Sequence, residues 1–446
     1  MTVEMLPSKL SGKMEKSFAY ETLRLRLPDI ITKIIDHVHR SWSGFDKAAR
    51  EDSSDVINRL GSLKYDLEHN RALNSVCDGR PDNAVWNEIL REETEANKGT
   101  PPSFFHTAWL YSECYIYRKI AEAFAFSASL RSFDWFGQQK SRAYQESLAA
   151  SCLLAECVVN MVSDDQQPNQ THLSKLLKMS LWGNKCDLSI SGGVSNSQKE
   201  DPLSQIECLD ENVLLDDSAQ VWQLLSQERA SGDSVVCVDI VLDNSGYELV
   251  TDLVLCYYLL KQWPDLRVIL HCKQLPWFVS DATLHDVHAT LYRMASSSAS
   301  SSTSHTQLQQ VASYLQHQLF ITHRLSLSAD MFWTLPCSIE QMHKYDPYLF
   351  RQLEHNSNLL LFKGDLNYRK ISQDRDWIPT HTFSPPFPVP LCAVRTLKAD
   401  TVFGLSEEKV KWATDRDTRW MLSANFGVIH FMQPHKHIAD NETDAT

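Results

Sequence analysis

One stretch, Ser234–Lys261, constrains the fold more than any other part of the sequence. It reads SVVCVDIVLDNSGYELVTDLVLCYYLLK, an apolar run, a polar turn and a second, longer apolar run. Val235–Leu242 has the length and β-branched composition of a strand buried on both faces, as strands of parallel sheets are. Tyr247–Lys261 is long enough for a crossover helix, and the turn between the two runs carries Asp243 and Asn244. Ligands of open parallel sheets bind beyond the carboxyl ends of the strands, so this turn is the first candidate for a functional site.

Strand-sized apolar segments followed by polar turns recur after this stretch, with helical patterns between them. They are Asp265–Leu270, Pro276–Val279, Leu319–Leu325, Asn358–Phe362, Pro390–Val394 and Phe426–Met432. Such alternation is typical of a parallel α/β sheet. From Phe18 to Val162 helical periodicity dominates instead, and we expect a domain boundary in the polar region between residues 163 and 232.

Several buried-looking polar residues are expected to be structural. The aromatic-rich segment WLYSECYIYRKI at 109–120 predicts an internal helix, and the simplest expectation is an ion pair between its Glu113 and Arg118. Asp239, inside the first strand candidate, and His271, at the end of the next, are likewise expected to pair internally.

The composition narrows the functional classes. A formal net charge of −13 argues against a nucleic-acid partner, because such proteins bind through basic surfaces. No membrane partner is expected, since the apolar run Leu253–Leu260 is too short to cross a bilayer and the start of the chain has no apolar signal core. The 11 cysteines form no CxxC pair and indicate reduced thiols. We therefore expect an intracellular protein, in the cytoplasm first, with the nucleus left open.

Glycine usage excludes the familiar nucleotide-binding loops. The chain has only 14 glycines, and neither GxGxxG nor GxxxxGK[ST] occurs. These motifs use glycine to bring backbone N–H groups close to a phosphate. Any phosphorylated ligand must therefore be held by side chains.

Four polar clusters follow the strand candidates and are expected to meet at one edge of the sheet. They are Asp243/Asn244, Asp281, Asp365/Asn367/Arg369/Lys370 and Arg395/Lys398. Two carboxylates and an amide oxygen suit Mg²⁺ or Mn²⁺, and nearby Arg and Lys side chains can neutralise phosphate oxygens. The set indicates metal-assisted phosphoryl hydrolysis. Taken singly, Asp-Asn is more often a turn or helix cap, and KGDLNYRK a solvated loop.

Three motifs in order, DNSGYELVTDLVL, KGDLNYRK and RTLK, resemble the damage-control phosphatase family, formerly a domain of unknown function. RTLK, with Arg395, Thr396 and Lys398, is similar to the RTxK motif of its third subfamily. WLYSECYIYRKI and LWGNKCDLSI extend the resemblance over nearly the whole chain. The departures are small: Ser245 stands where the family often has Ala, and Tyr247 where it often has Phe.

The resemblance implies an α/β fold in two parts. An N-terminal helical domain would span residues 1–230, with a polar linker near 191–217. A Rossmann-like α/β/α sandwich with a mainly parallel sheet would span 231–446, with a Ser-rich insertion at 295–304.

The resemblance also implies an enzyme, a metal-dependent phosphoric monoester hydrolase. Its metal ligands and catalytic residues would be Asp243, Asn244 and Asp281, with Mn²⁺ expected first and Ni²⁺, Co²⁺ or Mg²⁺ as alternatives. The substrate would be a small reactive sugar phosphate such as fructose 1-phosphate or fructose 6-phosphate. It would be held by Asp243, Asn244, Asp365, Leu366, Asn367, Tyr368, Arg369 and Lys398. A water activated by the metal is preferred to Asp243 as the nucleophile.

Two alternatives are kept. The first is methyl transfer from S-adenosylmethionine to protein glutamate carboxylates, an activity also attributed to this subfamily. There Glu248 and Asp281 would contact the cofactor, and the partner would be a protein substrate. The missing glycine-rich loop argues against it. The second is a non-catalytic binding protein with the same fold, which the presence of both Asp243 and Asp281 disfavours.

Overall fold

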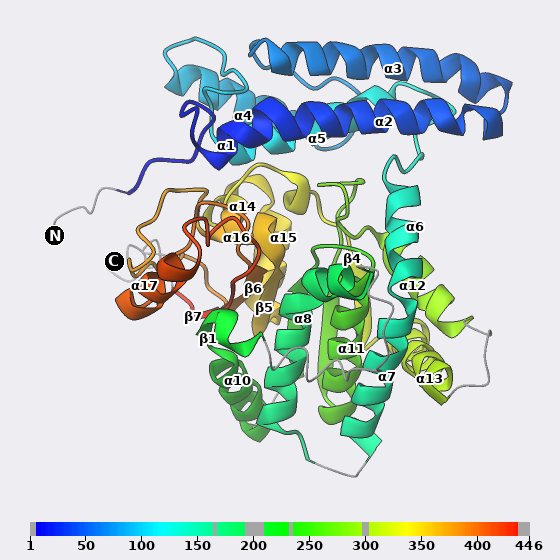
Figure 1. Cartoon of the computed structure of the whole chain (residues 1–446), viewed down its shortest axis with the longest axis vertical. Helices are drawn as coiled ribbons and strands as arrows, with labels where there is room; N and C mark the ends of the chain where they lie inside the picture. Colours follow the sequence, from blue (N-terminus) through cyan, green and yellow to red (C-terminus); the bar gives the residue numbers. More distant parts are fainter. Residues whose placement is uncertain (1–5, 164–166, 192–208, 232–234, 297–302, 436–446) are drawn as a thin grey trace, which may run out of the picture.

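A layer of helices lies across one end of an α/β sandwich in the computed structural model (Figure 1), which describes residues 6–163, 167–191, 209–231, 235–296 and 303–435. The helical layer contains α1 (Phe18–Glu21), α2 (Leu27–Ser41), α3 (Lys47–Glu68), α4 (Asn83–Ala96) and α5 (Trp109–Ala125). The helices that follow are α6 (Gly137–Glu146), α7 (Leu148–Ser163), α8 (Gln170–Ser191), α10 (Ser218–Ser231), α11 (Tyr247–Gln262), α12 (Leu284–Ala295), α13 (Thr303–His317), α14 (Met342–Tyr345), α15 (Pro347–Asn356), α16 (Gly364–Ile371) and α17 (Glu407–Arg416).

The described strands form one seven-stranded sheet in the order β1-β7-β6-β5-β2-β3-β4. They are β1 (Val213–Asp216), β2 (Val236–Val241), β3 (Leu266–His271), β4 (Leu325–Ser328), β5 (Leu359–Lys363), β6 (Leu391–Thr396) and β7 (Gly427–Met432). Neighbouring strands are parallel except β6 and β7, which are antiparallel. The neighbours β6, β5, β2 and β3 therefore end on the same side, which we call the carboxyl edge.

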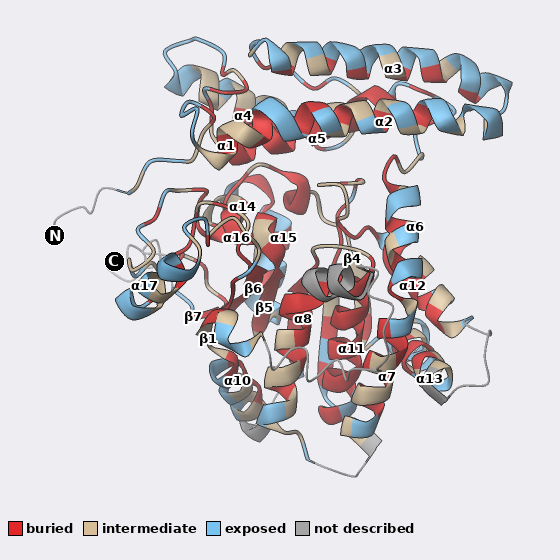
Figure 2. Ribbon diagram, viewed as in Figure 1, coloured by how far each residue is buried: buried red, intermediate tan, exposed pale blue. Residues whose placement is uncertain are grey.

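The sheet separates two apolar cores. Alternate residues of β5 point to opposite faces, as the pleat requires: Leu359 and Leu361 join one core, Leu360 and Phe362 the other. On the first face lies α11, buried at every residue except Lys261 because α7 and α8 cover its outer side (Figure 2). Neither α11 nor any other helix in the described part of the chain is long and apolar enough to cross a membrane.

The predicted α/β class with a mainly parallel sheet is confirmed, and the nine cysteines that the structure describes are free thiols. Two local predictions are wrong. The segment 319–325 is not a strand, because Gln318–Thr322 forms a π-helical turn and β4 begins only at Leu325. Pro276–Val279 is not a strand either: Phe278 and Val279 have φ values of 41° and 73°, in the left-handed region.

The chain before residue 231 contributes to both layers. The prediction assigned α7, α8, α10 and β1 to the helical domain, whereas α7 and α8 pack on α11 and β1 pairs with β7. The 181–190 segment, LWGNKCDLSI, lies within α8. Most of the predicted linker (192–208) and of the Ser-rich insertion (297–302) lies outside the described residues. The division into two domains at residue 230 stays a prediction.

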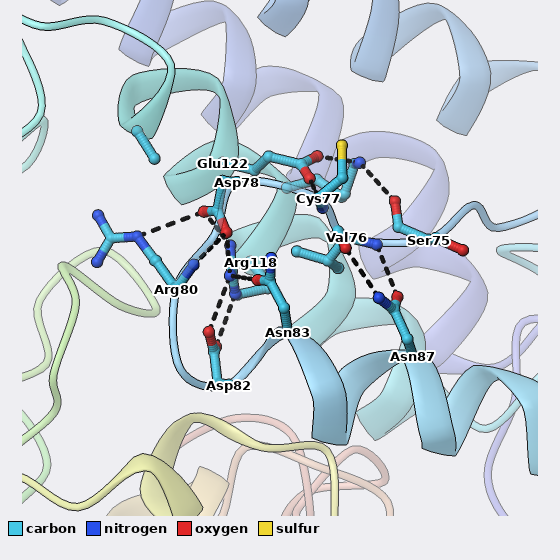
Figure 3. A network of polar contacts seen from close by, with 12 residues as sticks. Ser75, Val76, Cys77, Asp78, Arg80, Asp82, Asn83, Asn87, Arg118 and Glu122 are labelled. Carbon is cyan, nitrogen blue, oxygen red and sulfur yellow. Dashed lines mark hydrogen bonds and ion pairs between the residues drawn. The ribbon is translucent and has the colours of Figure 1, made fainter.

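A buried ionic cluster, which we call the Arg118 network, fixes the segment before α4 onto α5 (Figure 3). Arg118 is fully buried and donates hydrogen bonds of 2.7–2.9 Å to Asp78, Asp82 and Asn83. The predicted Glu113–Arg118 pair does not form, because residues five apart point to different faces of a helix. Glu113 instead pairs with a residue of the sandwich.

Candidate active site at the carboxyl edge

The turn after β2 holds Asp243 against the turn after β5. Gly364 opens α16 with φ of 79°, and a Cβ atom added there would lie 1.9 Å from Asp243 Oδ2. Only glycine can both adopt this backbone conformation and leave the space that the carboxylate occupies. Gly364 of KGDLNYRK is therefore required by Asp243, a side chain from the turn after β2. The KGDLNYRK segment alone does not show this requirement.

Asn244 is fixed by hydrogen bonds on both ends of its amide. Its Nδ2 donates to Asp243 Oδ2 and to Glu248 Oε2, each at 2.8 Å, and its Oδ1 accepts a hydrogen bond from the Ser280 hydroxyl. The amide orientation follows from these partners, and it leaves Oδ1 with a second lone pair for a ligand.

Asp281 reaches the site from a loop and not from the end of a strand, which corrects the sequence prediction. The loop runs from β3 to α12 and forms a bridge between Asn244 and Asp281. Ala282 N donates to Asp243 O at 2.8 Å, and Ser245 N donates to Ser280 O at 2.7 Å. The left-handed backbone of Val279, unusual for a β-branched residue, immediately precedes this contact and turns the loop back to the sheet.

In the cluster around Asp243, buried carboxylates outnumber the buried lysines that pair with them. Lys273 Nζ lies 3.4 Å from Asp281 Oδ2, and Lys363 Nζ lies 3.1 Å from Glu248 and 3.2 Å from Asp252. The carboxylates are thus Asp243, Glu248, Asp252 and Asp281, against two lysines. The excess of negative charge is what a bound divalent cation would balance.

The titration behaviour of two of these groups reflects this excess. Burial, and then the charges of Glu248 and Asp281, raise the pKa of Asp243 well above its usual value. Burial also raises the pKa of Asp281 to about 6, against the opposing charge of Lys273. Both shifts mean that the negative form is poorly compensated by the protein itself.

The donor set fits a hard divalent cation. Asp243, Asn244 and Asp281 offer carboxylate and amide oxygens, the ligand type of Mg²⁺ and Mn²⁺. Asn367, whose Nδ2 donates to Lys363 O at 2.7 Å, has a buried Oδ1 without a hydrogen-bond partner. Among the described residues, no three His, Cys, Asp or Glu side chains are grouped as ligands of one ion, so any metal here relies on amide oxygen as well.

The predicted substrate residues at 365–369 form the first turns of α16, not a loop. Leu366 and Tyr368 are buried; Leu366 belongs to the core and Tyr368 lies beneath the Arg395 guanidinium, 4.3 Å from ring centroid to Cζ. Arg395 Nε donates to Asp365 Oδ1 at 2.8 Å. Arg395 also donates to the carbonyls of Ala399 and Thr401. In the RTLK motif the Arg side chain thus ties β6 to α16.

Lys398 is the cation of this motif that faces the acidic cluster. It is half-buried, and its charge acts to lower the pKa of Asp243. Thr396, at the end of β6, is buried. The Asp365 carboxylate accepts a hydrogen bond from Lys398 N at 3.3 Å, which fixes the backbone from which the Lys398 side chain extends.

Arg369 lies against the helical layer. Its Nε donates to Asp374 Oδ1 at 2.8 Å and its Nη1 to Glu113 Oε2 at 2.6 Å, while its guanidinium stacks on Trp109 with Cζ 3.7 Å from the ring centroid. Its Nη2 is buried without a hydrogen-bond partner. One helical turn beyond Glu113, Tyr117 stacks on Phe278 of the Asp281 loop, with ring centroids 4.6 Å apart. Helix α5 therefore packs over the carboxyl edge.

The structure brings Asp243, Asn244, Asp281 and Glu248 into one cluster and sets Asp365, Lys398 and Arg369 beside it. The predicted roles of these residues stay predictions. Residues to which the sequence assigned no role at the site are Lys273, Ser280, Lys363, Gly364 and Tyr117, together with Glu113, which was expected to pair with Arg118 instead. The available signal was charge inside apolar segments: Lys363 directly follows the apolar run of β5, and Glu113 interrupts an aromatic helix.

Comparison with known proteins identifies the family. The family model described as the damage-control phosphatase ARMT1-like domain matches residues 22–412. The chain belongs to this family. Proteins named damage-control phosphatase ARMT1 are 38% identical in Danio rerio, covering 96% of this chain and 98% of that protein, and 35% identical in Homo sapiens, covering 96% and 99%. The predicted resemblance to damage-control phosphatases is confirmed, and the family supports a phosphatase that acts on a small metabolite.

A solved structure also matches this ARMT1-like chain. It is a duf89 family protein from Pyrococcus horikoshii, at 12% sequence identity and a TM-score of 0.47, covering 93% of this chain and 98% of that one.

Proposed function

We propose that this member of the family is a metal-dependent phosphatase that hydrolyses reactive sugar phosphates such as fructose 1-phosphate and fructose 6-phosphate. The observation that carries the proposal is an excess of buried carboxylates at the carboxyl edge, close to basic side chains. Buried carboxylates without sufficient cations, Asp243 and Asp281 among them, lie close to Lys398, and Arg369 lies farther along α16. A divalent cation and a phosphate group would each find the opposite charge they require.

Asp243, Asn244 and Asp281 would hold the ion, with Mn²⁺ expected first and Ni²⁺, Co²⁺ or Mg²⁺ as alternatives. Bound there, the ion would polarise a phosphoryl oxygen and acidify a water molecule. The raised pKa of Asp243 means that this carboxyl takes up a proton more readily in the metal-free site, and binding of a cation would favour release of that proton.

The protein's own cations would orient the phosphate. Lys398 contributes a point charge and Arg369 the unpaired N–H donors of Nη2. In the reaction the oxygen of water bonds to phosphorus, the bond from phosphorus to the sugar oxygen breaks, and that oxygen leaves as a hydroxyl. Water is preferred to Asp243 as nucleophile, because Asp243 Oδ2 is bonded to Asn244 and packed against Gly364.

The alternative, methyl transfer from S-adenosylmethionine to protein glutamates, gains no support from the site. It requires Glu248 and Asp281 to contact the cofactor. Glu248 is 5% exposed, and its two oxygens are engaged by Asn244 and Lys363. A cofactor would have to displace both partners.

The test is phosphate release from fructose 1-phosphate by the purified protein with Mn²⁺. We expect release that EDTA abolishes, and a fall of more than about 10³-fold in Asp243→Ala, since this variant removes a ligand of the ion. Full activity of Asp243→Ala would contradict the site assignment. Binding of labelled S-adenosylmethionine, followed by metal-independent methyl transfer, would replace the proposal by its alternative.

A further inference from the structure

The joint between α5 and α16 connects the helical layer to the carboxyl edge. Glu113 and Trp109 come from α5, Arg369 from α16, and Asp374 from the turn after α16. Glu113 Oε2 and Asp374 Oδ1 accept hydrogen bonds from Nη1 and Nε of the same guanidinium. The Glu113 and Arg369 positions are 256 residues apart in sequence, so only the folded chain brings them together.

The joint leaves one part of Arg369 free for a ligand. Arg369 is 2% exposed, and its Nη2 has no hydrogen-bond partner. A buried N–H donor without an acceptor is costly, so a ligand that supplies an acceptor would be favoured there. Arg369 lies four residues after Asp365 on α16 and therefore on the same face of the helix, and Asp365 Oδ1 accepts a hydrogen bond from Lys398 N at 3.3 Å.

Helix α5 is anchored by contacts on both sides of Glu113, at Leu110 and at Arg118. At its start, no side chain of the flanking residues caps the helix; Asp374 Oδ2 accepts from Leu110 N at 2.6 Å and serves as the cap from the sandwich. Toward its end, the Arg118 network anchors the helix (Figure 3). A carboxylate between two such anchors can fix the direction of its partner.

We propose that Glu113 is a positioning residue that holds Arg369 so that its Nη2 group meets the phosphate of the substrate. The inference rests on the proposed function and extends it: the helical layer is part of the phosphate-binding site, although it contributes no metal ligand. Glu113 acts through Arg369 and does not itself touch the reacting atoms. Its loss weakens binding of phosphate and leaves metal binding unchanged.

The variant is Glu113→Gln, which keeps the shape of the side chain and removes its charge. Its matched control is Glu122→Gln: Glu122 is also a buried carboxylate of α5, but it accepts from Cys77 N at 2.6 Å and pairs with Lys119, away from Arg369. Both changes remove one buried negative charge from the same helix. A purely structural role for Glu113 would make the two variants behave alike.

The measurements are binding of inorganic phosphate to the Mn²⁺-loaded protein and binding of Mn²⁺ alone, both by titration calorimetry, with KM and kcat for fructose 1-phosphate. For Glu113→Gln we expect phosphate affinity about tenfold lower and KM about tenfold higher, the size of a lost charge-assisted contact, with Mn²⁺ affinity unchanged. Glu122→Gln should leave all four values unchanged. Glu113→Asp, which keeps the charge, should restore part of the phosphate affinity.

A double-mutant cycle completes the test. In an Arg369→Lys background, Glu113→Gln should have little further effect on phosphate affinity, since its target is gone. Equal phosphate affinity in Glu113→Gln and Glu122→Gln would overturn the inference, and so would additive effects of Glu113→Gln and Arg369→Lys. Should Glu113→Gln fail to fold, the same cycle is measured with Glu113→Asp in place of Glu113→Gln, alone and combined with Arg369→Lys. Absence of sugar phosphate turnover in the unaltered protein would overturn the proposed function alone, because phosphate binding is measured without turnover.

Discussion

The Arg118 network and the carboxyl edge are both buried and both ionic, yet their charges are balanced differently. In the Arg118 network, Asp78 and Asp82 face two arginines, Arg118 and Arg80, and the Arg118 donors are used (Figure 3). At the carboxyl edge, four buried carboxylates face two buried lysines and the half-buried Lys398. A network balanced in charge needs no further ion, and this one ties the segment before α4 to α5. An incomplete one is costly unless a ligand completes it, and that difference separates the structural cluster from the candidate active site.

The two regions should therefore respond in opposite ways to loss of one charge. Arg118→Ala removes the arginine that donates to both Asp78 and Asp82 and should cost about 3–5 kcal/mol of unfolding free energy. Asp243→Asn removes an uncompensated charge and should leave the metal-free protein as stable as the unaltered one or more stable. Denaturant unfolding of the metal-free proteins measures both.

A control for the helical layer is Arg91→Ala, which breaks an exposed 2.8 Å pair with Glu95 and should cost less than about 1 kcal/mol. If Asp243→Asn destabilises the metal-free protein as much as Arg118→Ala, the two regions are alike and the contrast is lost.

Site residues that are positioned by their neighbours in sequence could be predicted, whereas those positioned by partners far away in the chain could not. Asp243 and Asn244 follow from a local rule, because they come directly after a buried strand. Asp281 was expected after a strand but lies on a loop. The loop turns at Phe278 and Val279, where the backbone is left-handed although neither residue is a glycine, so the sequence does not indicate the turn. Local patterns report on neighbours in sequence, and the turn is held instead by contacts with Tyr117 and Asn244.

The segment 364–371 shows the same limit more clearly. Its polar residues predict a solvated loop, whereas α16 is buried because partners elsewhere in the chain satisfy those residues. Arg369 is paired with Glu113, and Lys370 donates to the carbonyls of Phe332 and Cys337. The Glu113–Arg118 pair was predicted from proximity in sequence. It does not form, because the two side chains lie on different faces of α5 and each pairs with residues far away in the sequence.

The pH dependence of stability should separate the two regions as well. The pKa of Asp281 is raised to about 6, so this carboxyl binds a proton more tightly in the folded than in the unfolded protein. The resulting contribution to stability is complete below the unfolded pKa and is lost as the pH rises through about 6. Although burial opposes it, hydrogen bonds from Arg118 lower the pKa of Asp78, so that contribution is present at neutral pH and is lost as the pH falls through the acidic range.

We therefore expect the metal-free protein to lose stability as the pH rises from about 5 to about 7, and Asp281→Asn to flatten this slope. Thermal unfolding across this pH range, in the presence of a chelator, measures the effect. A slope that is the same in the unaltered protein and in Asp281→Asn would show that the carboxyl edge is not the source of the pH dependence.

The central claim, that the carboxyl edge is completed by a divalent cation, is tested most directly by calorimetric titration of Mn²⁺ into the metal-free protein and into Asp243→Asn. We expect one ion per chain in the unaltered protein, release of protons on binding, and loss of binding in Asp243→Asn. Mn²⁺ binding of equal affinity in both proteins, or failure of the unaltered protein to bind any of Mn²⁺, Ni²⁺, Co²⁺ and Mg²⁺, would contradict it.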